Sequence, residues 1–180
     1  MTHKIALTWP VPASPSKMLP ASGRPGSFWE NRGDRFHCGV DIYAPFGSKV
    51  WAVDDGFVVK TELFTLQRLI DYWNDTYAVT IEHKGGLIVR YAEMCDIVPK
   101  TGASVAKGEC IGLVGQVLEP VRITEQAPPY IRQLKRKKNP TMLHLEMLNR
   151  YPFHIPDYLG GNTFQNVKPE CLLDPTLFWG

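Results

Sequence analysis

Alternating apolar and polar residues dominate the middle of the chain and predict strands. Runs with a period of two recur at 40–43, 49–53, 57–61, 77–83, 87–93 and 142–148. Asp54-Asp55-Gly56 and Lys84-Gly85-Gly86 separate neighbouring runs and are typical of tight turns. This pattern predicts an all-β fold of antiparallel sheets.

Two segments depart from this alternation. Apolar residues at helical spacing (Leu63, Leu66, Ile70 and Trp73) predict one short inserted helix over about 62–74. Residues 117–141 are poorly patterned and predict a long basic loop, with its cations at Arg132, Lys135, Arg136, Lys137 and Lys138. This loop is either a solvated surface or a patch for an anionic polymer.

The flanking segments differ from the patterned middle in composition. Residues 1–34 form an extended lead-in rich in Pro and Gly, and 35–148 form the expected domain. The tail, 149–180, ends in Leu177, Phe178 and Trp179, which we expect to pack back on that domain.

Composition narrows the class of protein. The chain has 180 residues, with 44% hydrophobic and 21% charged residues, which is ordinary for a globular protein. The formal net charge is +2, and the basic run lacks interleaved aromatic residues, so we expect no nucleic-acid partner. No apolar run reaches about 18 residues, so we expect no membrane span. Four prolines interrupt residues 1–20, so we predict no signal peptide in them.

The four cysteines form no CxxC pair and show no regular spacing. We expect reduced and mostly buried thiols that act as small apolar side chains. A disulfide, which needs an oxidising compartment, is the alternative.

Histidines and carboxylates offer a metal-binding set. Asp41 follows His37 by four residues, and Glu146 follows His144 by two. Two remote imidazoles and a carboxylate are a common hydrolytic zinc set. The chain must bend between His37 and Asp41, and Gly39 suits that bend. Singly, each histidine is better explained as a loop or core residue.

Five stretches together resemble the lysostaphin/LytM-like zinc endopeptidase family. They begin with His37-Cys-Gly-Val-Asp41 and its Ala-Pro-Phe-Gly turn, and they end with Leu143-His-Leu-Glu146. Between these lie 49–59, 79–93 and 102–115, and Asp174-Pro175 is similar to the family's terminal signature. The resemblance implies a lysostaphin-like groove (a duplicated hybrid motif), one Zn²⁺, and cleavage of peptide bonds in cell-wall peptidoglycan by a zinc-activated water.

The resemblance also implies site residues. The metal ligands map onto His37, Asp41 and His144, with the fourth position open to water. Met142, Glu146 and Tyr91 are candidate substrate-binding residues. A location in the cell envelope, secreted or delivered by phage, follows from the family alone.

Two substitutions leave the activity open. Glu93 and Met142 stand where the family has auxiliary imidazoles. Glu93 is a candidate general base, whereas Met142 can donate no hydrogen bond. A working peptidase, a slow one, and an inactive zinc-binding pseudopeptidase that holds cell wall or a protein partner all remain possible.

Overall fold

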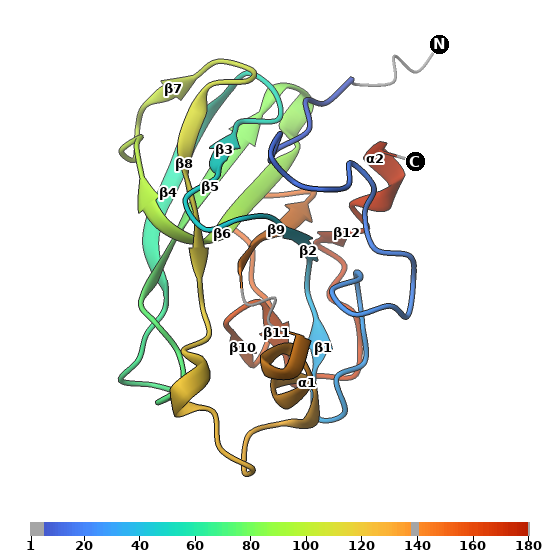
Figure 1. Cartoon of the computed structure of the whole chain (residues 1–180). Helices are drawn as coiled ribbons and strands as arrows, with labels where there is room; N and C mark the ends of the chain where they lie inside the picture. Colours follow the sequence, from blue (N-terminus) through green and yellow to red (C-terminus); the bar gives the residue numbers. More distant parts are fainter. Residues whose placement is uncertain (1–5, 138–140, 180) are drawn as a thin grey trace.

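Antiparallel strands are the main regular structure of the fold, which the computed structural model describes over residues 6–137 and 141–179 (Figure 1). The large sheet has the order β12-β9-β8-β6-β5-β4-β7, with β2 paired to β9 and β3 to β8. Its strands are β2 (Val40–Tyr43), β3 (Lys49–Trp51), β4 (Gly56–Thr65), β5 (Thr76–His83), β6 (Ile88–Ile97), β7 (Ser104–Val105), β8 (Cys110–Gln116), β9 (Thr141–Leu148) and β12 (Leu172–Leu173). The predicted all-β class is confirmed.

A small sheet and a few short helices complete the described residues. The sheet joins β1 (Phe36–His37), β11 (Asn162–Thr163) and β10 (Tyr158–Leu159). The helices are α1 (Pro129–Lys137), α2 (Thr176–Trp179) and the 3₁₀ turns η1 (Lys84–Gly86) and η2 (Pro120–Arg122). Over these residues no helix has the length and apolar character needed to cross a membrane.

The predicted helix over about 62–74 is wrong. β4 continues as a strand to Thr65, where it pairs with Thr76 of β5, and turns fill the connection between the two strands. Leu63 is half exposed, so the apolar spacing does not mark one buried face. Cross-strand pairing in this hairpin replaces the helical hydrogen bonds that the spacing suggested.

The inserted helix lies instead in the predicted basic loop. α1 buries Ile131 while it exposes Lys135 and Arg136, which is an amphipathic pattern over two turns. Pro129 begins the helix, where its missing N–H costs no hydrogen bond. Lys138 of the basic run lies outside the described residues.

β9 separates the main core from the candidate site. Leu143, Leu145 and Met147 are fully buried in the main hydrophobic cluster. The alternate residues Met142, His144 and Glu146 project from the opposite face, as the period of a strand requires. All three are also buried, so a second layer of chain covers that face.

Both flanking segments pack on the sheets, although Leu177 of the tail, which was also predicted to pack there, is exposed. Trp9 of the lead-in meets Trp179 of α2 edge to face, with ring centroids 5.7 Å apart. β12 of the tail pairs with the end of β9 through Leu172 and Leu148. The four cysteines are free thiols, as expected; Cys38 and Cys171 are buried, whereas Cys95 and Cys110 are only partly buried.

Candidate metal centre

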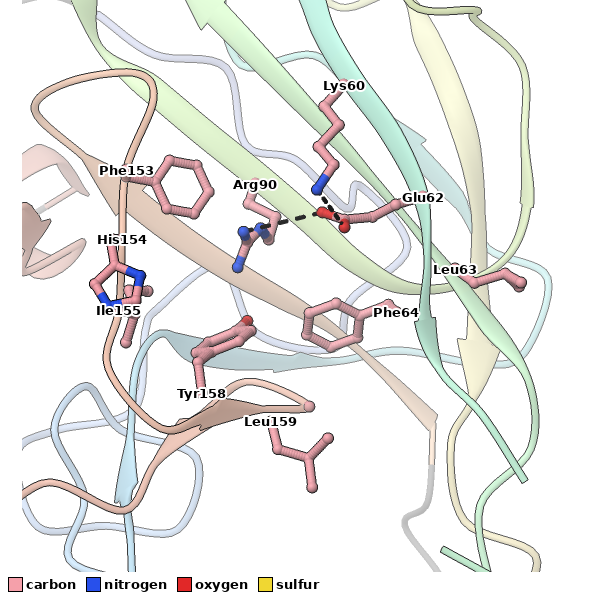
Figure 2. A pocket seen from close by; sticks show the side chains of 11 residues that line it. Lys60, Glu62, Leu63, Phe64, Arg90, Phe153, His154, Ile155, Tyr158 and Leu159 are labelled. Carbon is pink, nitrogen blue, oxygen red and sulfur yellow. Dashed lines mark ion pairs between the residues drawn. The ribbon is translucent and has the colours of Figure 1, made fainter. Parts of the chain in front are cut away.

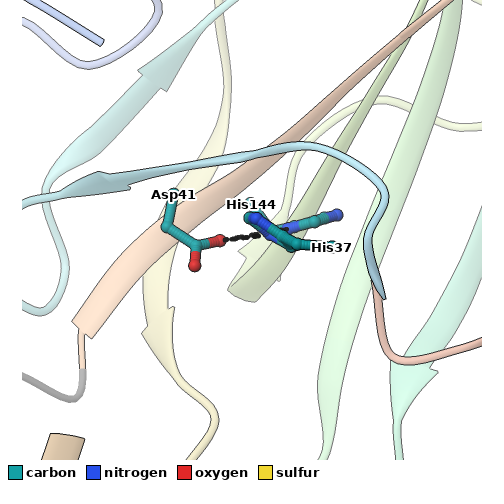
Figure 3. Close-up of side chains that lie close together, drawn as sticks. All are labelled: His37, Asp41 and His144. Carbon is teal, nitrogen blue, oxygen red and sulfur yellow. Dashed lines mark hydrogen bonds and ion pairs between the residues drawn. The ribbon is translucent and has the colours of Figure 1, made fainter. Parts of the chain in front are cut away.

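Three side chains from three strands converge on one point (Figure 3). Nε2 of His37 lies 3.0 Å from Oδ1 of Asp41, and Nδ1 of His144 lies 3.1 Å from the same oxygen. The two ring nitrogens are 3.0 Å apart. The three atoms thus form a nearly equilateral triangle, slightly tighter than the roughly 3.3 Å spacing of tetrahedral ligands at about 2.0–2.1 Å from a zinc ion.

Strand pairing positions these ligands. Asp41 of β2 stands directly opposite His144 of β9. A bend at Gly39 returns the chain from His37 to Asp41, as predicted. Gly39 also has a second role, because a Cβ there would lie 2.3 Å from the carbonyl oxygen of Leu145 and 2.9 Å from the ring of His144.

The outer ring nitrogens show why a cation fits. Nδ1 of His37 donates to the carbonyl oxygen of Ser27 at 2.8 Å, and Nε2 of His144 donates to Oε1 of Glu146 at 3.0 Å. With these protons outward, both inner nitrogens present lone pairs to each other and to the Asp41 carboxylate. Such a set of acceptors requires a cation between them.

The pKa shifts agree with this crowding of acceptors. Burial lowers the pKa of His37, and the nearby Arg32 lowers it further. Burial also opposes the charging of His144, but hydrogen bonds to Asp41 and Glu146 outweigh it and raise its pKa to about 9. Without a metal, the cluster therefore holds a proton on His144.

Glu146 supports the site from behind, which corrects its prediction as a substrate-binding residue. Its carboxylate is fully buried and bonds His144, Nη1 of Arg90 at 2.9 Å and the hydroxyl of Tyr158 at 2.5 Å. Burial opposes its ionisation, but Arg90 and His144 hold its pKa at about 2. A carboxylate in this place orients the imidazole and raises its basicity.

Tyr91 is also wrongly predicted to bind substrate. It points into the main core, where its hydroxyl accepts a hydrogen bond from the backbone N–H of Val53 at 3.0 Å and lies 2.9 Å from Nε2 of His83. Tyr91 and His144 project from opposite faces of the sheet. Neighbouring residues of β6 face opposite sides of the sheet, so Tyr91 faces the core while the positions before and after it face the other side.

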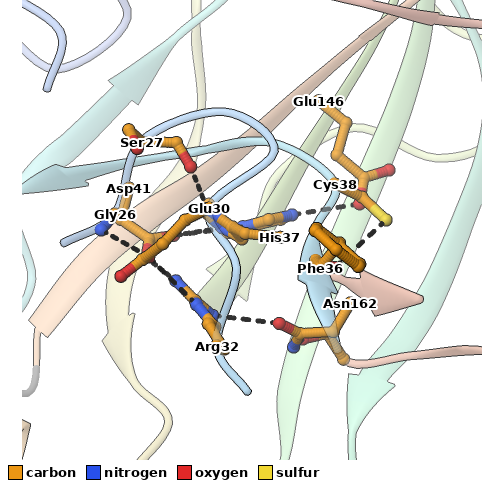
Figure 4. A network of polar contacts seen from close by, with 12 residues as sticks. Gly26, Ser27, Glu30, Arg32, Phe36, His37, Cys38, Asp41, Glu146 and Asn162 are labelled. Atoms are coloured by element: carbon orange, nitrogen blue, oxygen red, sulfur yellow. Dashed lines mark hydrogen bonds and ion pairs between the residues drawn. The ribbon is translucent and has the colours of Figure 1, made fainter. Parts of the chain in front are cut away.

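Sequence reasoning missed Arg32 (Figure 4). Its Nη2 lies 2.9 Å from Oδ2 of Asp41, and its other nitrogens bond Glu30 and Asn162 at 3.1 Å. The guanidinium thus holds the carboxylate oxygen that faces away from the two imidazoles. The only sequence signal was a charged residue shortly before His37.

Glu93 and Met142 line one small cavity beside Asp41. The cavity measures about 40 Å³, which is enough for a water molecule. Glu93 has a φ of +64°, at the point where β6 changes partner from β9 to β8. The register of β6 against β5 also shifts between Tyr91 and Met94, and such a β-bulge re-aims a side chain. Burial, with the nearby Asp41 adding to it, raises the pKa of Glu93 to about 8.

A cover that the sequence did not predict forms one wall of this cavity. It consists of residues 117–137, and α1 contributes Tyr130, Ile131 and Leu134 to the cavity wall. Its apolar residues pack on Trp73 in a separate hydrophobic cluster. The Tyr130 ring lies 5.0 Å from the Arg32 guanidinium. His37, Asp41 and His144 are 0%, 4% and 1% exposed, and Phe64 and Gly161 also cover the ring of His144.

The fold and the three convergent ligands define a β-sheet protein with a candidate site for a divalent metal. Residues 35–126, about half of the chain, match Peptidase family M23, and the chain belongs to this family. That match includes His37, Asp41 and Glu93, whereas His144 follows it. The predicted resemblance is confirmed.

Two curated relatives come from Vibrio cholerae. Peptidoglycan DD-endopeptidase ShyC is 34% identical over 79 residues, and ShyA is 34% identical over 82 residues. Each match covers 44% of this chain and 16% of the relative, so the chain corresponds to a small part of those proteins.

A solved structure agrees with the fold. The catalytic domain of the antimicrobial peptidase lysostaphin from Staphylococcus simulans superposes with a TM-score of 0.51 at 18% identity. The superposition covers 86% of this chain and 89% of that one, which establishes a shared lysostaphin-like architecture.

Proposed function

We propose that this chain binds one Zn²⁺ through His37, Asp41 and His144 and hydrolyses peptide bonds in the peptides of bacterial cell-wall peptidoglycan. Membership of peptidase family M23 supports this proposal, as does the similarity to two proteins named peptidoglycan DD-endopeptidases. Because peptidoglycan is part of the cell envelope, we propose that the protein acts there.

One observation carries the proposal. Three acceptor atoms lie 3.0–3.1 Å apart, and outer hydrogen bonds keep the imidazole protons away from them. Two imidazoles and one carboxylate are a donor set that zinc prefers, and three protein ligands are typical of catalytic rather than structural sites. The donor chemistry and the spacing therefore both suit zinc.

Glu93 is the proposed proton carrier. Zinc, when bound, supplies a Lewis acid that polarises a carbonyl and favours deprotonation of water. Glu93 lines the cavity beside Asp41, so its carboxyl group can exchange a proton with a water held there. Protonated Glu93 can also donate a hydrogen bond, which Met142 cannot.

Substrate access requires movement of the 117–137 cover. The three ligands are almost fully buried, and a cavity of about 40 Å³ does not hold a peptide. We propose that α1 moves away from Trp73 when a substrate enters. The cover would then limit hydrolysis to substrates that displace it.

The test is release of new amino termini from purified peptidoglycan. Protein loaded with one zinc per chain should release them, chelator-treated protein should not, and added zinc should restore release. Absence of release by the loaded protein would contradict the enzymatic proposal.

A second candidate is a zinc-binding pseudopeptidase that holds cell wall or a protein partner without cutting. The cover and the two residues at the auxiliary positions, Glu93 and Met142, favour it. Co-sedimentation with peptidoglycan in the absence of any released amino termini would support this candidate over the enzyme.

A further inference from the structure

A second pocket surrounds Arg90 (Figure 2), which bonds Glu146 on the same face of the sheet as His144. Its volume is about 320 Å³, within the range of small-molecule sites. We call it the Arg90 pocket, and it is defined by Lys60, Glu62, Phe64, Arg90, Phe153 and Tyr158. Gly160 lines both this pocket and the cavity beside Asp41, so the two are neighbours.

Neighbouring side chains fix the Arg90 guanidinium in place, but some of its hydrogen-bond donors have no partner among the described residues. Its guanidinium carbon lies 4.3 Å from the Phe153 ring centre and 5.0 Å from that of Tyr158. Among the described residues, its hydrogen bond runs from Nη1 to Glu146, and Nε has no partner. Nη2 approaches Glu62 only to 3.9 Å, which exceeds hydrogen-bond distance. A side chain only 7% exposed therefore keeps unused donor capacity beside the pocket.

Next to Arg90, β4 contributes one charge of each sign to the pocket. Nζ of Lys60 lies 2.7 Å from Oε2 of Glu62, and these side chains are 48% and 27% exposed. Ion pairs this exposed contribute little to stability, so a ligand can exchange with them at small cost. A ligand thus meets two cations, one carboxylate and the aromatic rings of Phe64, Phe153 and Tyr158.

We propose that the Arg90 pocket is a specificity subsite for an unblocked α-amino acid group on a branch of the substrate, with its carboxylate facing Arg90 and Lys60 and its ammonium facing Glu62. This inference rests on the proposed peptidase function. The aromatic rings accommodate the aliphatic arm that joins such a group to a peptide. A purely anionic group would face Glu62, and a purely cationic one would face Lys60 and Arg90.

The strand register relates the subsite to the metal centre. Arg90 stands opposite Glu146, and Ala92 stands opposite His144, so the two sites lie two strand positions apart, or about 7 Å. Phe64 joins them, because it lines the pocket and stacks on the His144 ring with centroids 5.8 Å apart. A branch near the cleaved bond can therefore reach the pocket.

Three probes with one carbon skeleton test the ligand class. Nε-acetyl-lysine carries both charges, its α-carboxamide lacks the anion, and Nα,Nε-diacetyl-lysine lacks the cation. Titration of each probe, in both enantiomeric series, into the full chain should show binding of the first at least about 10-fold tighter than of the other two. Equal affinity for the three, or no binding of Nε-acetyl-lysine, would overturn the subsite.

Single substitutions test which residues discriminate between the three probes. Glu62→Gln should remove the preference over the diacetyl probe, and Lys60→Gln should reduce the preference over the carboxamide. The exposed residues Glu82 and Lys49 provide matched controls, and Glu82→Gln and Lys49→Gln should leave both preferences unchanged. An equal loss in variants and controls would contradict the assignment.

Hydrolysis separates a substrate branch from a free amino acid effector. The zinc-loaded chain should cleave a peptide bearing lysine through its side-chain amine with a kcat/KM about 10-fold higher than for the α-carboxamide peptide. Equal kcat/KM values would overturn the substrate subsite. Selective probe binding without cleavage of either peptide would contradict the proposed function, while the ligand class would stand on the binding data.

Discussion

Oε1 of Glu146 accepts a hydrogen bond from Nε2 of His144 at 3.0 Å, on the side of the ring that faces away from Asp41. This bond keeps the Nδ1 lone pair of His144 directed at the metal centre. Glu146→Gln should weaken zinc affinity about 10- to 100-fold, because an amide is a weaker acceptor and raises ligand basicity less. Competition with a chelating dye measures this effect, with Glu82→Gln as the control. Unchanged affinity would show that Glu146 does not tune the site.

Loss of a ligand should be more severe than loss of its support. His144→Ala removes one of three donor atoms, so we expect the purified variant to carry no zinc by metal analysis. His154→Ala is the matched control, because His154 lines the Arg90 pocket and should leave zinc content unchanged. Full zinc occupancy in a folded His144→Ala protein would remove His144 from the ligand set.

Glu93→Gln tests the proton carrier separately from metal binding. The amide keeps the size of the side chain but cannot exchange a proton, so hydrolysis should fall about 100-fold or more. Zinc content should stay at the wild-type level. Asp96→Asn, an exposed change on the same strand, should alter neither quantity. Hydrolysis that survives Glu93→Gln at the wild-type rate would assign proton transfer elsewhere.

Acid should destabilise the metal-free chain through Glu146. Its pKa is about 2 in the folded chain against an ordinary 4.5. The unfolded chain therefore binds this proton first, and the stabilisation present above pH 4.5 is lost as the pH falls towards 2. A tenfold change in proton affinity is about 1.4 kcal/mol, so the loss is roughly 3 kcal/mol. Unfolding free energies at several pH values should show a smaller loss in Glu146→Gln, and parallel curves would refute the assignment.

The 117–137 cover should control access to the metal. Ile131 is buried against Trp73 in the cluster that holds α1 in place. Ile131→Ala should loosen the helix, because large-to-small changes in a buried cluster cost about 2–5 kcal/mol. Zinc removal by a chelator should become severalfold faster, and hydrolysis should rise. Arg136→Ala, an exposed change on the same helix, should leave both rates unchanged, and equal rates in Ile131→Ala would argue against a cover that moves.

Local pattern predicted the strands well, because neighbouring positions carry the signal. The run 40–43 is β2 at the predicted bounds, and the turn at Lys84-Gly85-Gly86 is η1. Over 62–74 the same reasoning was wrong. Apolar spacing cannot tell a helix from a hairpin whose strands pair beyond the local window.

The sequence by itself determined the antiparallel β texture, the family, and the residue types that can hold zinc. Only the tertiary structure decided that Arg32 holds Asp41, that Glu146 supports His144, that Tyr91 faces the core, and that α1 covers the site. The physical reason is that the spacing of apolar residues indicates which face of a helix or strand is apolar. Which chain segment lies against that face depends on contacts between residues more than 100 positions apart, as between His37 and His144.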